Sequence, residues 1–260
     1  MTKSIPALVV KAPGTNCDIE TADALRRAGA DPRVLTTREL LTDPEQILRA
    51  RILCFPGGFA HGDDIASARI LATQCRLRLG DVLERLVDTE GGYVLGICNG
   101  FQALVKLGLL PRQAAGKLAQ EVTVVHNDSG RYECRWVRLR VADSACKFLP
   151  AGALWEMPVG HGEGKFVPGP SFDASSSGLV AFRYVDASDA PTDGYPANPN
   201  GSIAAVAGIT DVSGRVLGLM PHPDRSYRAT QHPDRLRTAI ADDDMAGAQL
   251  FRRLVEAAAG

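Results

Sequence analysis

The feature that most constrains the fold is an alternation of short apolar runs with helical patterns before about residue 118. The apolar runs at 7–10 and 52–55 end at Gly and Pro residues, as buried strands do. Between such runs, residues 18–27 and 67–86 repeat apolar side chains at helical spacing. Strands that alternate with helices pair in parallel, with the helices covering the faces of the sheet. This half of the chain therefore predicts an α/β fold.

The pattern changes after about residue 118, where strand-like runs follow one another without helices between them. These runs lie at 121–125, 136–141, 179–185 and 203–209. A turn at 211–214 separates the last of them from the run 216–220, which predicts an antiparallel hairpin. The segment 245–258 predicts a closing amphipathic helix. We therefore expect one domain over residues 1–260, with a three-layer, mainly parallel central sheet and an antiparallel extension.

The charge balance limits the class of partner. The chain has 29 Lys and Arg against 30 Asp and Glu, so it carries no basic field for nucleic acid or an anionic membrane. A small-molecule substrate is expected instead. The six cysteines form no CxxC pair or zinc-ligand spacing, and no apolar stretch is long enough to span a membrane. Together with the absence of a secretion signal, these features predict a reduced, cytoplasmic, soluble protein without disulfides.

The segment Gly96-Ile97-Cys98-Asn99-Gly100 lies where a predicted buried strand passes directly into a helix. Glycines two residues before and after a central residue are typical of the sharp turn that exposes a nucleophile. The helix that follows aims free N–H groups and a partial positive charge at the Cys98 sulfur, which favours the thiolate. The alternative is a cysteine that only packs at a tight turn, as free cysteines often do. The paired glycines favour the nucleophile.

A cysteine nucleophile needs a base, and His222 is the best of the five histidines. It ends a predicted strand and is followed two residues later by Asp224, whose carboxylate could fix the imidazole tautomer. In an extended segment these two side chains would project to the same side. The signal is weak alone, because ordinary turns also contain this tripeptide and the chain repeats it at 232–234.

The segment Pro56-Gly57-Gly58-Phe59 follows another predicted strand. Its glycines would let the backbone approach a ligand, so the N–H of Gly58 could stabilise an oxyanion together with the N–H of Asn99. The alternative is a plain turn.

Together, these motifs resemble the class I glutamine amidotransferases, and more narrowly the glutaminase subunits of phosphoribosylformylglycinamidine synthase, a family of purine biosynthesis. The resemblance rests on segments between residues 13 and 223, which are Pro13-Gly14-Thr15-Asn16-Cys17-Asp18, Pro56-Gly57-Gly58-Phe59, Gly96-Ile97-Cys98-Asn99-Gly100-Phe101-Gln102, His161-Gly162-Glu163-Gly164, Asn198-Pro199-Asn200-Gly201-Ser202 and Gly218-Leu219-Met220-Pro221-His222-Pro223. The first segment and the Asn-Pro-Asn-Gly-Ser segment are specific to the narrower family, whereas the others are shared more widely.

The resemblance implies that glutamine forms a glutamyl thioester on Cys98 and that His222 shuttles the protons. Ammonia would pass to a synthetase subunit that uses ATP to convert formylglycinamide ribonucleotide to its amidine. No GxxxxGK[ST] loop is present, which fits ATP and magnesium on that partner and no cofactor or metal in this chain. Whether the complex also needs a small bridging subunit stays open.

The resemblance also supplies the expected substrate-binding residues. Gln102 matches a position that contacts glutamine, and Gly57 and Phe59 belong to the loop beside the substrate. His161 and Glu163 would lie in a loop beside the glutamine pocket or the partner interface, with a mobile glycine-rich loop as the alternative. Cys17 also lies near a helix start, but it lacks the flanking glycines of Cys98.

The chain departs from the family pattern at Asp224, where glutamate is usual. The carboxylate is one methylene shorter, a loss of reach of roughly 1.5 Å. A backbone shift or a bridging water could restore the contact, or His222 could be poorly oriented and the enzyme slow. Two competing functions follow: a silenced scaffold for the synthetase, and a cysteine peptidase. Asn99 disfavours the peptidase, since those enzymes carry histidine directly after the elbow cysteine.

Overall fold

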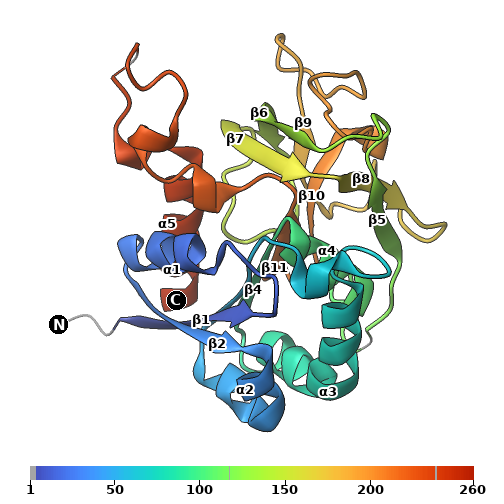
Figure 1. Ribbon diagram of the computed structural model, residues 1–260, viewed down its shortest axis with the longest axis vertical. Helices are drawn as coiled ribbons and strands as arrows, with labels where there is room; N and C mark the ends of the chain where they lie inside the picture. Colours follow the sequence, from blue (N-terminus) through green and yellow to red (C-terminus); the bar gives the residue numbers. More distant parts are fainter. Residues whose placement is uncertain (1–3, 117, 238) are drawn as a thin grey trace.

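A nine-stranded sheet crosses the whole molecule in the computed structural model, which describes residues 4–116, 118–237 and 239–260 (Figure 1). The strand order is β2-β1-β3-β4-β11-β10-β9-β6-β7, and β5 and β8 form a separate two-stranded sheet. The strands are β1 (Ile5–Lys11), β2 (Ala30–Thr36), β3 (Ile52–Phe55), β4 (Tyr93–Ile97), β5 (Val122–His126), β6 (Glu133–Val141), β7 (Leu154–His161), β8 (Glu163–Pro168), β9 (Val180–Tyr184), β10 (Val206–Thr210) and β11 (Val216–Leu219). The α-helices are α1 (Asp18–Arg27), α2 (Thr37–Thr42), α3 (Arg69–Asp88), α4 (Asn99–Leu107) and α5 (Ala246–Ala259).

The first half of the chain builds the parallel part of the sheet. β1 pairs in parallel with β2 and β3, and β4 pairs in parallel with β3 and β11. Every residue of β3 and β4 is buried, which explains why both strands are continuous apolar runs. Helices α1 and α5 contact each other and β1, while α3 and α4 contact each other and β4. The predicted mixed sheet flanked by helices is thus confirmed.

The second half adds the antiparallel strands. The predicted hairpin is present as β10 and β11, although β10 begins three residues later than expected because Ile203–Ala205 form a 3₁₀ turn. The prediction of a loop at 161–164 is wrong: β7 ends at His161 and β8 begins at Glu163. Sequence patterns missed β7 because Pro158 interrupts it, yet Pro158 pairs with Trp136 within the sheet.

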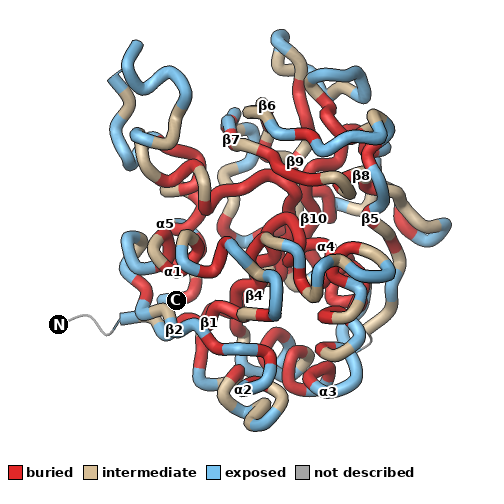
Figure 2. The backbone as a smooth tube through the Cα atoms, viewed as in Figure 1, coloured by how far each residue is buried: buried red, intermediate tan, exposed pale blue. Residues whose placement is uncertain are grey.

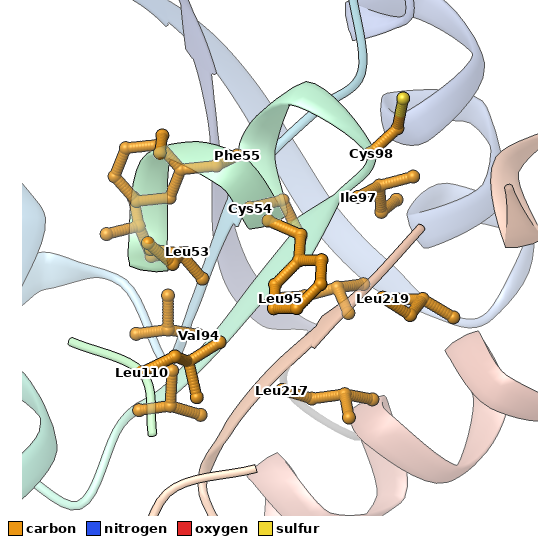
Figure 3. Packing of buried hydrophobic residues seen from close by; sticks show 14 of the residues in the cluster. Leu53, Cys54, Phe55, Val94, Leu95, Ile97, Cys98, Leu110, Leu217 and Leu219 are labelled. Carbon is orange, nitrogen blue, oxygen red and sulfur yellow. The ribbon is translucent and has the colours of Figure 1, made fainter. Parts of the chain in front are cut away.

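Buried residues run from the parallel to the antiparallel strands (Figure 2). Leu95 on β4 lies on the same face of the sheet as Leu217 and Leu219 on β11, whereas Leu53 on β3 lies with Val94 on the other face (Figure 3). The strand ends that carry the predicted nucleophile and histidine therefore stand on a close-packed base.

A buried ion cluster anchors the turn between β10 and β11. The guanidinium of Arg112 is fully buried and donates to Asp88 at 2.7 and 2.8 Å and to Asp211 at 3.0 Å. Asp211 also accepts hydrogen bonds from the backbone of Arg215 and Val216 within the turn. The cluster ties the hairpin to the end of α3 and so holds β11 beside β4.

None of the helices among residues 4–116, 118–237 and 239–260 combines the length and apolar character needed to cross a membrane.

Candidate active site

Cys98 occupies a strained turn between β4 and α4. Its backbone has φ 50° and ψ −106°, outside the regions that side-chain-bearing residues favour. The flanking glycines are required: a Cβ on Gly96 would lie 2.9 Å from the carbonyl oxygen of Gly100, and a Cβ on Gly100 would lie 1.8 Å from that of Phe55. The turn therefore has the geometry predicted from the glycine spacing, and strain of this kind gathers at functional sites.

The Cys98 side chain points away from the apolar packing of the neighbouring strands (Figure 3). Its backbone N–H donates to Leu219 on β11 at 2.8 Å, and its Sγ lies 3.6 Å from the carbonyl oxygen of Gly160 on β7. The residue is only 5% exposed. The sulfur thus lies at the N-terminus of α4, sheltered by the antiparallel strands.

The sheet brings His222 close to Cys98. β4 and β11 are parallel neighbours, with Ile97 paired to Leu219, so the residues that follow both strands emerge at one edge. The backbone N–H of His222 donates to Pro158 at 2.8 Å, which fixes the histidine against β7. Its Nε2 has no hydrogen-bond partner among the described residues.

The shorter carboxylate of Asp224 does reach the imidazole. Asp224 Oδ1 lies 3.0 Å from His222 Nδ1, and both side chains are buried. The expected extended geometry is wrong, because Pro223–Arg225 form a 3₁₀ turn. Proline suits the first position of such a turn, and the turn folds the carboxylate back to the ring. Neither a bridging water nor a poorly oriented His222 is needed.

The electrostatic balance favours a protonated His222. Burial alone would lower the pKa of His222, but the charges of Asp224 and Cys98 and the hydrogen bond to Asp224 raise it well above its usual value. An imidazolium beside a sulfur suits the protonation of a leaving amine.

The Gly57-Gly58 loop packs directly against the histidine. A Cβ on Gly57 would lie 2.6 Å from His222 Cε1, so any side chain there would force the imidazole to move. Gly58 has φ 146°, and a Cβ there would lie 2.8 Å from the backbone of both Thr15 and Asn16. Phe59 is 46% exposed, and its N–H donates to Gly14 at 3.0 Å. The side chain of Asn99 holds the end of the loop by accepting from the N–H of Ala60 at 3.0 Å.

Gln102 and Glu163 are hydrogen-bonded within the protein. Gln102 Nε2 donates to the carbonyl oxygen of Glu163 at 2.5 Å, and its Oε1 accepts from Asn99 at 3.0 Å. The Glu163 carboxylate accepts from the N–H of Ser67 at 3.3 Å and lies 3.8 Å from the buried ammonium of Lys106. These contacts join α4 to the β7–β8 turn.

His161 is likewise held by amide side chains. Its Nδ1 lies 3.1 Å from Asn127 Oδ1 and its Nε2 lies 3.5 Å from the amide nitrogen of Asn200. Burial lowers the pKa of His161 to about 4, so its ring is neutral near pH 7. The Asn-Pro-Asn-Gly-Ser segment, left outside the predicted catalytic set, thus supports this histidine through Asn200.

The sequence did not predict that Cys17 and Arg225 contact each other. Cys17 is fully buried, and Arg225 Nη2 donates to its Sγ at 3.0 Å. Among the described residues, Cys17, His222 and Asp224 form a group that could hold a metal ion. One potential ligand atom from each of the three lies within 4.8 Å of the others. The available signals were the family-specific segment that contains Cys17 and the position of Arg225 directly after Asp224.

Comparison with known proteins identifies the family of the chain. Residues 5–256 match the family described as the CobB/CobQ-like glutamine amidotransferase domain. Phosphoribosylformylglycinamidine synthase subunit PurQ of Dehalococcoides mccartyi is 44% identical over 230 residues, or 88% of each chain. PurQ of Methanococcus maripaludis is 36% identical over 246 residues, which cover 93% of this chain and 90% of that one. A chain of the PurLQS structure from Thermotoga maritima has a TM-score of 0.71 at 28% identity, covering 98% of this chain and 99% of its own.

Proposed function

This chain belongs to the glutamine amidotransferase family, among the PurQ subunits of phosphoribosylformylglycinamidine synthase, and we propose that it is the glutaminase subunit of such a synthase. In this proposal it hydrolyses glutamine and delivers ammonia to a synthetase subunit. That subunit converts formylglycinamide ribonucleotide to formylglycinamidine ribonucleotide with ATP. The observation that carries the proposal is the strained Cys98 turn beside the buried pair of His222 and Asp224.

The proposed reaction has two stages. The Cys98 thiolate attacks the side-chain amide carbon of glutamine, and the resulting tetrahedral intermediate carries the negative charge on oxygen. Protonated His222 gives its proton to the amide nitrogen, the C–N bond breaks and ammonia leaves a glutamyl thioester. His222 then takes a proton from water, which attacks the thioester and releases glutamate. Asp224 keeps the imidazole oriented through its 3.0 Å contact with Nδ1.

We assign stabilisation of the oxyanion to the backbone N–H groups of Gly58 and Asn99. Asn99 opens α4, where the helix dipole favours negative charge, and the Gly57-Gly58 loop lies against His222. In this proposal Gly57 and the exposed Phe59 line the bound glutamine. Gln102 and Glu163 shape the same pocket through the hydrogen bond that joins α4 to the β7–β8 turn, and His161 does so from its position beside Asn127.

The remaining parts of the proposal follow from the family. The chain is a single glutamine amidotransferase domain over residues 1–260, which the match over residues 5–256 supports. It binds a synthetase subunit and a small bridging subunit, as the name of the PurLQS structure suggests for its relative. It needs no cofactor of its own, ATP and magnesium bind to the synthetase, and the complex works in the cytoplasm.

An electrophilic glutamine analogue tests the assignment of the nucleophile. The complex is treated with the analogue, and the adduct is located by mass spectrometry. We expect a single adduct on Cys98, slowed by free glutamine and lost in Cys98→Ala. Cys75, a buried cysteine on α3, should stay unmodified. An unmodified Cys98 in the active complex would contradict the proposal.

A further inference from the structure

A second buried sulfur lies beside the proposed catalytic histidine. The Sγ of Cys17, a nitrogen of His222 and an oxygen of Asp224 all lie within 4.8 Å of one another. Gly57 faces both the sulfur and the ring, because a Cβ on Gly57 would lie 3.3 Å from Cys17 Sγ and 2.6 Å from His222 Cε1. The sulfur therefore borders the imidazole on the side of the Gly57-Gly58 loop.

The position of this sulfur is fixed from several directions. Arg225 Nη2 donates to Cys17 Sγ at 3.0 Å, a short contact for a guanidinium and a sulfur. The thiol lies 3.2 Å from Asn16 Oδ1, and the N–H of Cys17 donates to the carbonyl oxygen of Gly57 at 3.2 Å. Arg225 belongs to the same 3₁₀ turn as Asp224, so one short turn supplies both the carboxylate and the cation.

Cysteine, histidine and aspartate can also ligate zinc, so a metal site is the alternative function of this cluster. The guanidinium of Arg225 argues against it. Its fixed positive charge lies within hydrogen-bond distance of the sulfur that the metal would need. Because the sulfur already accepts this hydrogen bond, it is not free to ligate a metal ion.

We infer, on the basis of the proposed function, that Cys17 and Arg225 are positioning residues for His222. The sulfur held by Arg225 supports the imidazole beside Gly57, while Asp224 binds its Nδ1. The two contacts keep His222 oriented and protonated for proton transfer to the leaving amide nitrogen. Neither Cys17 nor Arg225 forms a covalent bond in the reaction.

The electrostatics of His222 support this inference. Burial lowers the pKa of His222, whereas Asp224, Cys98 and the neighbouring sulfur of Cys17 raise it. Removing the sulfur would delete that contribution and so lower the pKa of His222. The titratable and charged groups around the imidazole are Cys17, Cys98, Tyr132, His161, Asp224 and Arg225.

The test is the pH dependence of kcat/KM for glutamine, measured on the assembled complex. Because protonated His222 must donate its proton to the leaving amide nitrogen, the alkaline limb of the profile reports loss of that proton. We expect Cys17→Ala to lower kcat/KM about tenfold and to move the alkaline limb to lower pH, and Cys17→Ser to recover part of both. Cys75→Ala, the removal of another buried thiol, should leave the limb unchanged.

A double variant checks that the two residues act as a unit. Since Arg225 acts through the sulfur, Cys17→Ala combined with Arg225→Gln should lose little more activity than the worse single variant. Independent residues would give multiplied losses, which would overturn the inference. A Cys17→Ala loss that is equal at every pH, or no loss at all, would also overturn it and leave the proposed function intact. A wild-type complex that does not hydrolyse glutamine would remove both.

Discussion

The chain contains the tripeptide His-Pro-Asp twice, and the two copies occupy different environments. At 222–224 the histidine and the carboxylate are buried and lie 3.0 Å apart. At 232–234, in the loop between β11 and α5 that projects from the body of the molecule (Figure 1), the backbone N–H of Asp234 donates to His232 Nδ1 at 3.1 Å. Identical residues thus give a side-chain pair in one copy and a local turn in the other.

The neighbours of each copy explain the difference. His222 follows β11, which the sheet holds beside β4 and Cys98. His232 instead packs its ring against Trp136, with centroids 4.9 Å apart, and its Nε2 lies 3.5 Å from Glu156. Position in the fold, and not the tripeptide, selects which histidine can act as a base.

The largest expected effect separates the two histidines. His222→Ala should lower kcat/KM for glutamine by about 10²- to 10⁴-fold, because the proton shuttle is lost. His232→Ala should change it by less than about twofold, since it removes one aromatic contact worth about 1 kcal/mol of stability. Steady-state ammonia release by the complex measures both effects. Equal losses in the two variants would contradict the assignment of the proton shuttle to His222.

The carboxylates of the two tripeptides, Asp224 and Asp234, should also differ in their effect on kcat, with the larger loss at Asp224. Asp224→Asn should lower kcat about 100-fold, because the amide cannot stabilise the imidazolium through Nδ1. Asp234→Asn should leave kcat near the wild-type value. A comparable loss in both variants, with both still folded by circular dichroism, would show that the sequence motif matters more than its position.

A third histidine, His161, shows what happens to the pKa of a buried imidazole that has no carboxylate such as Asp224 beside its Nδ1. It is buried like His222, but its ring faces amides, and its pKa falls from 6.5 to about 4. Between these values the unfolded chain binds the proton and the folded chain does not, so this histidine lowers the free energy of unfolding as the pH falls. The loss should be about 2 kcal/mol between pH 7 and pH 5.

Urea unfolding of wild type and His161→Gln at both pH values isolates that contribution. The sign for His222 is opposite, because its folded pKa is raised: its contribution is complete below the unfolded pKa and is lost as the pH rises through the folded pKa. We therefore expect the wild type to lose more stability on acidification than His161→Gln. Parallel behaviour of the two proteins would contradict the neutral buried ring.

The smallest effect concerns the length of the carboxylate. Asp224→Glu restores the residue usual in the family, but Asp224 is fully buried in a 3₁₀ turn fitted to the shorter side chain. The extra methylene should destabilise the protein by about 1–3 kcal/mol and lower kcat less than tenfold. Thermal unfolding and ammonia release measure the two effects, and a faster, more stable variant would show that aspartate orients His222 poorly.

The sequence predicted the parts of the molecule that depend on local patterns. The strand-helix alternation, the glycines around Cys98 and the β10–β11 turn each act through neighbouring residues, and each was confirmed. β7 was missed because Pro158 and Gly160 weaken its strand pattern, although pairing with β6 stabilises it.

Contacts between distant segments could not be predicted from the sequence. The contact of Arg225 with Cys17 joins residues 208 positions apart, and the binding of Gln102 to Glu163 joins residues 61 apart. A single sequence gives no signal for such pairs, so residues expected to face glutamine could not be separated from those that brace the site.

The most direct test of the central claim compares two nitrogen sources in the complex with the synthetase subunit. We expect Cys98→Ala to abolish glutamine-dependent formation of formylglycinamidine ribonucleotide and to leave ammonia-dependent formation at the wild-type rate, because only the thioester route needs the thiol. Loss of both activities would make Cys98 structural. Retention of both would contradict its assignment as the nucleophile.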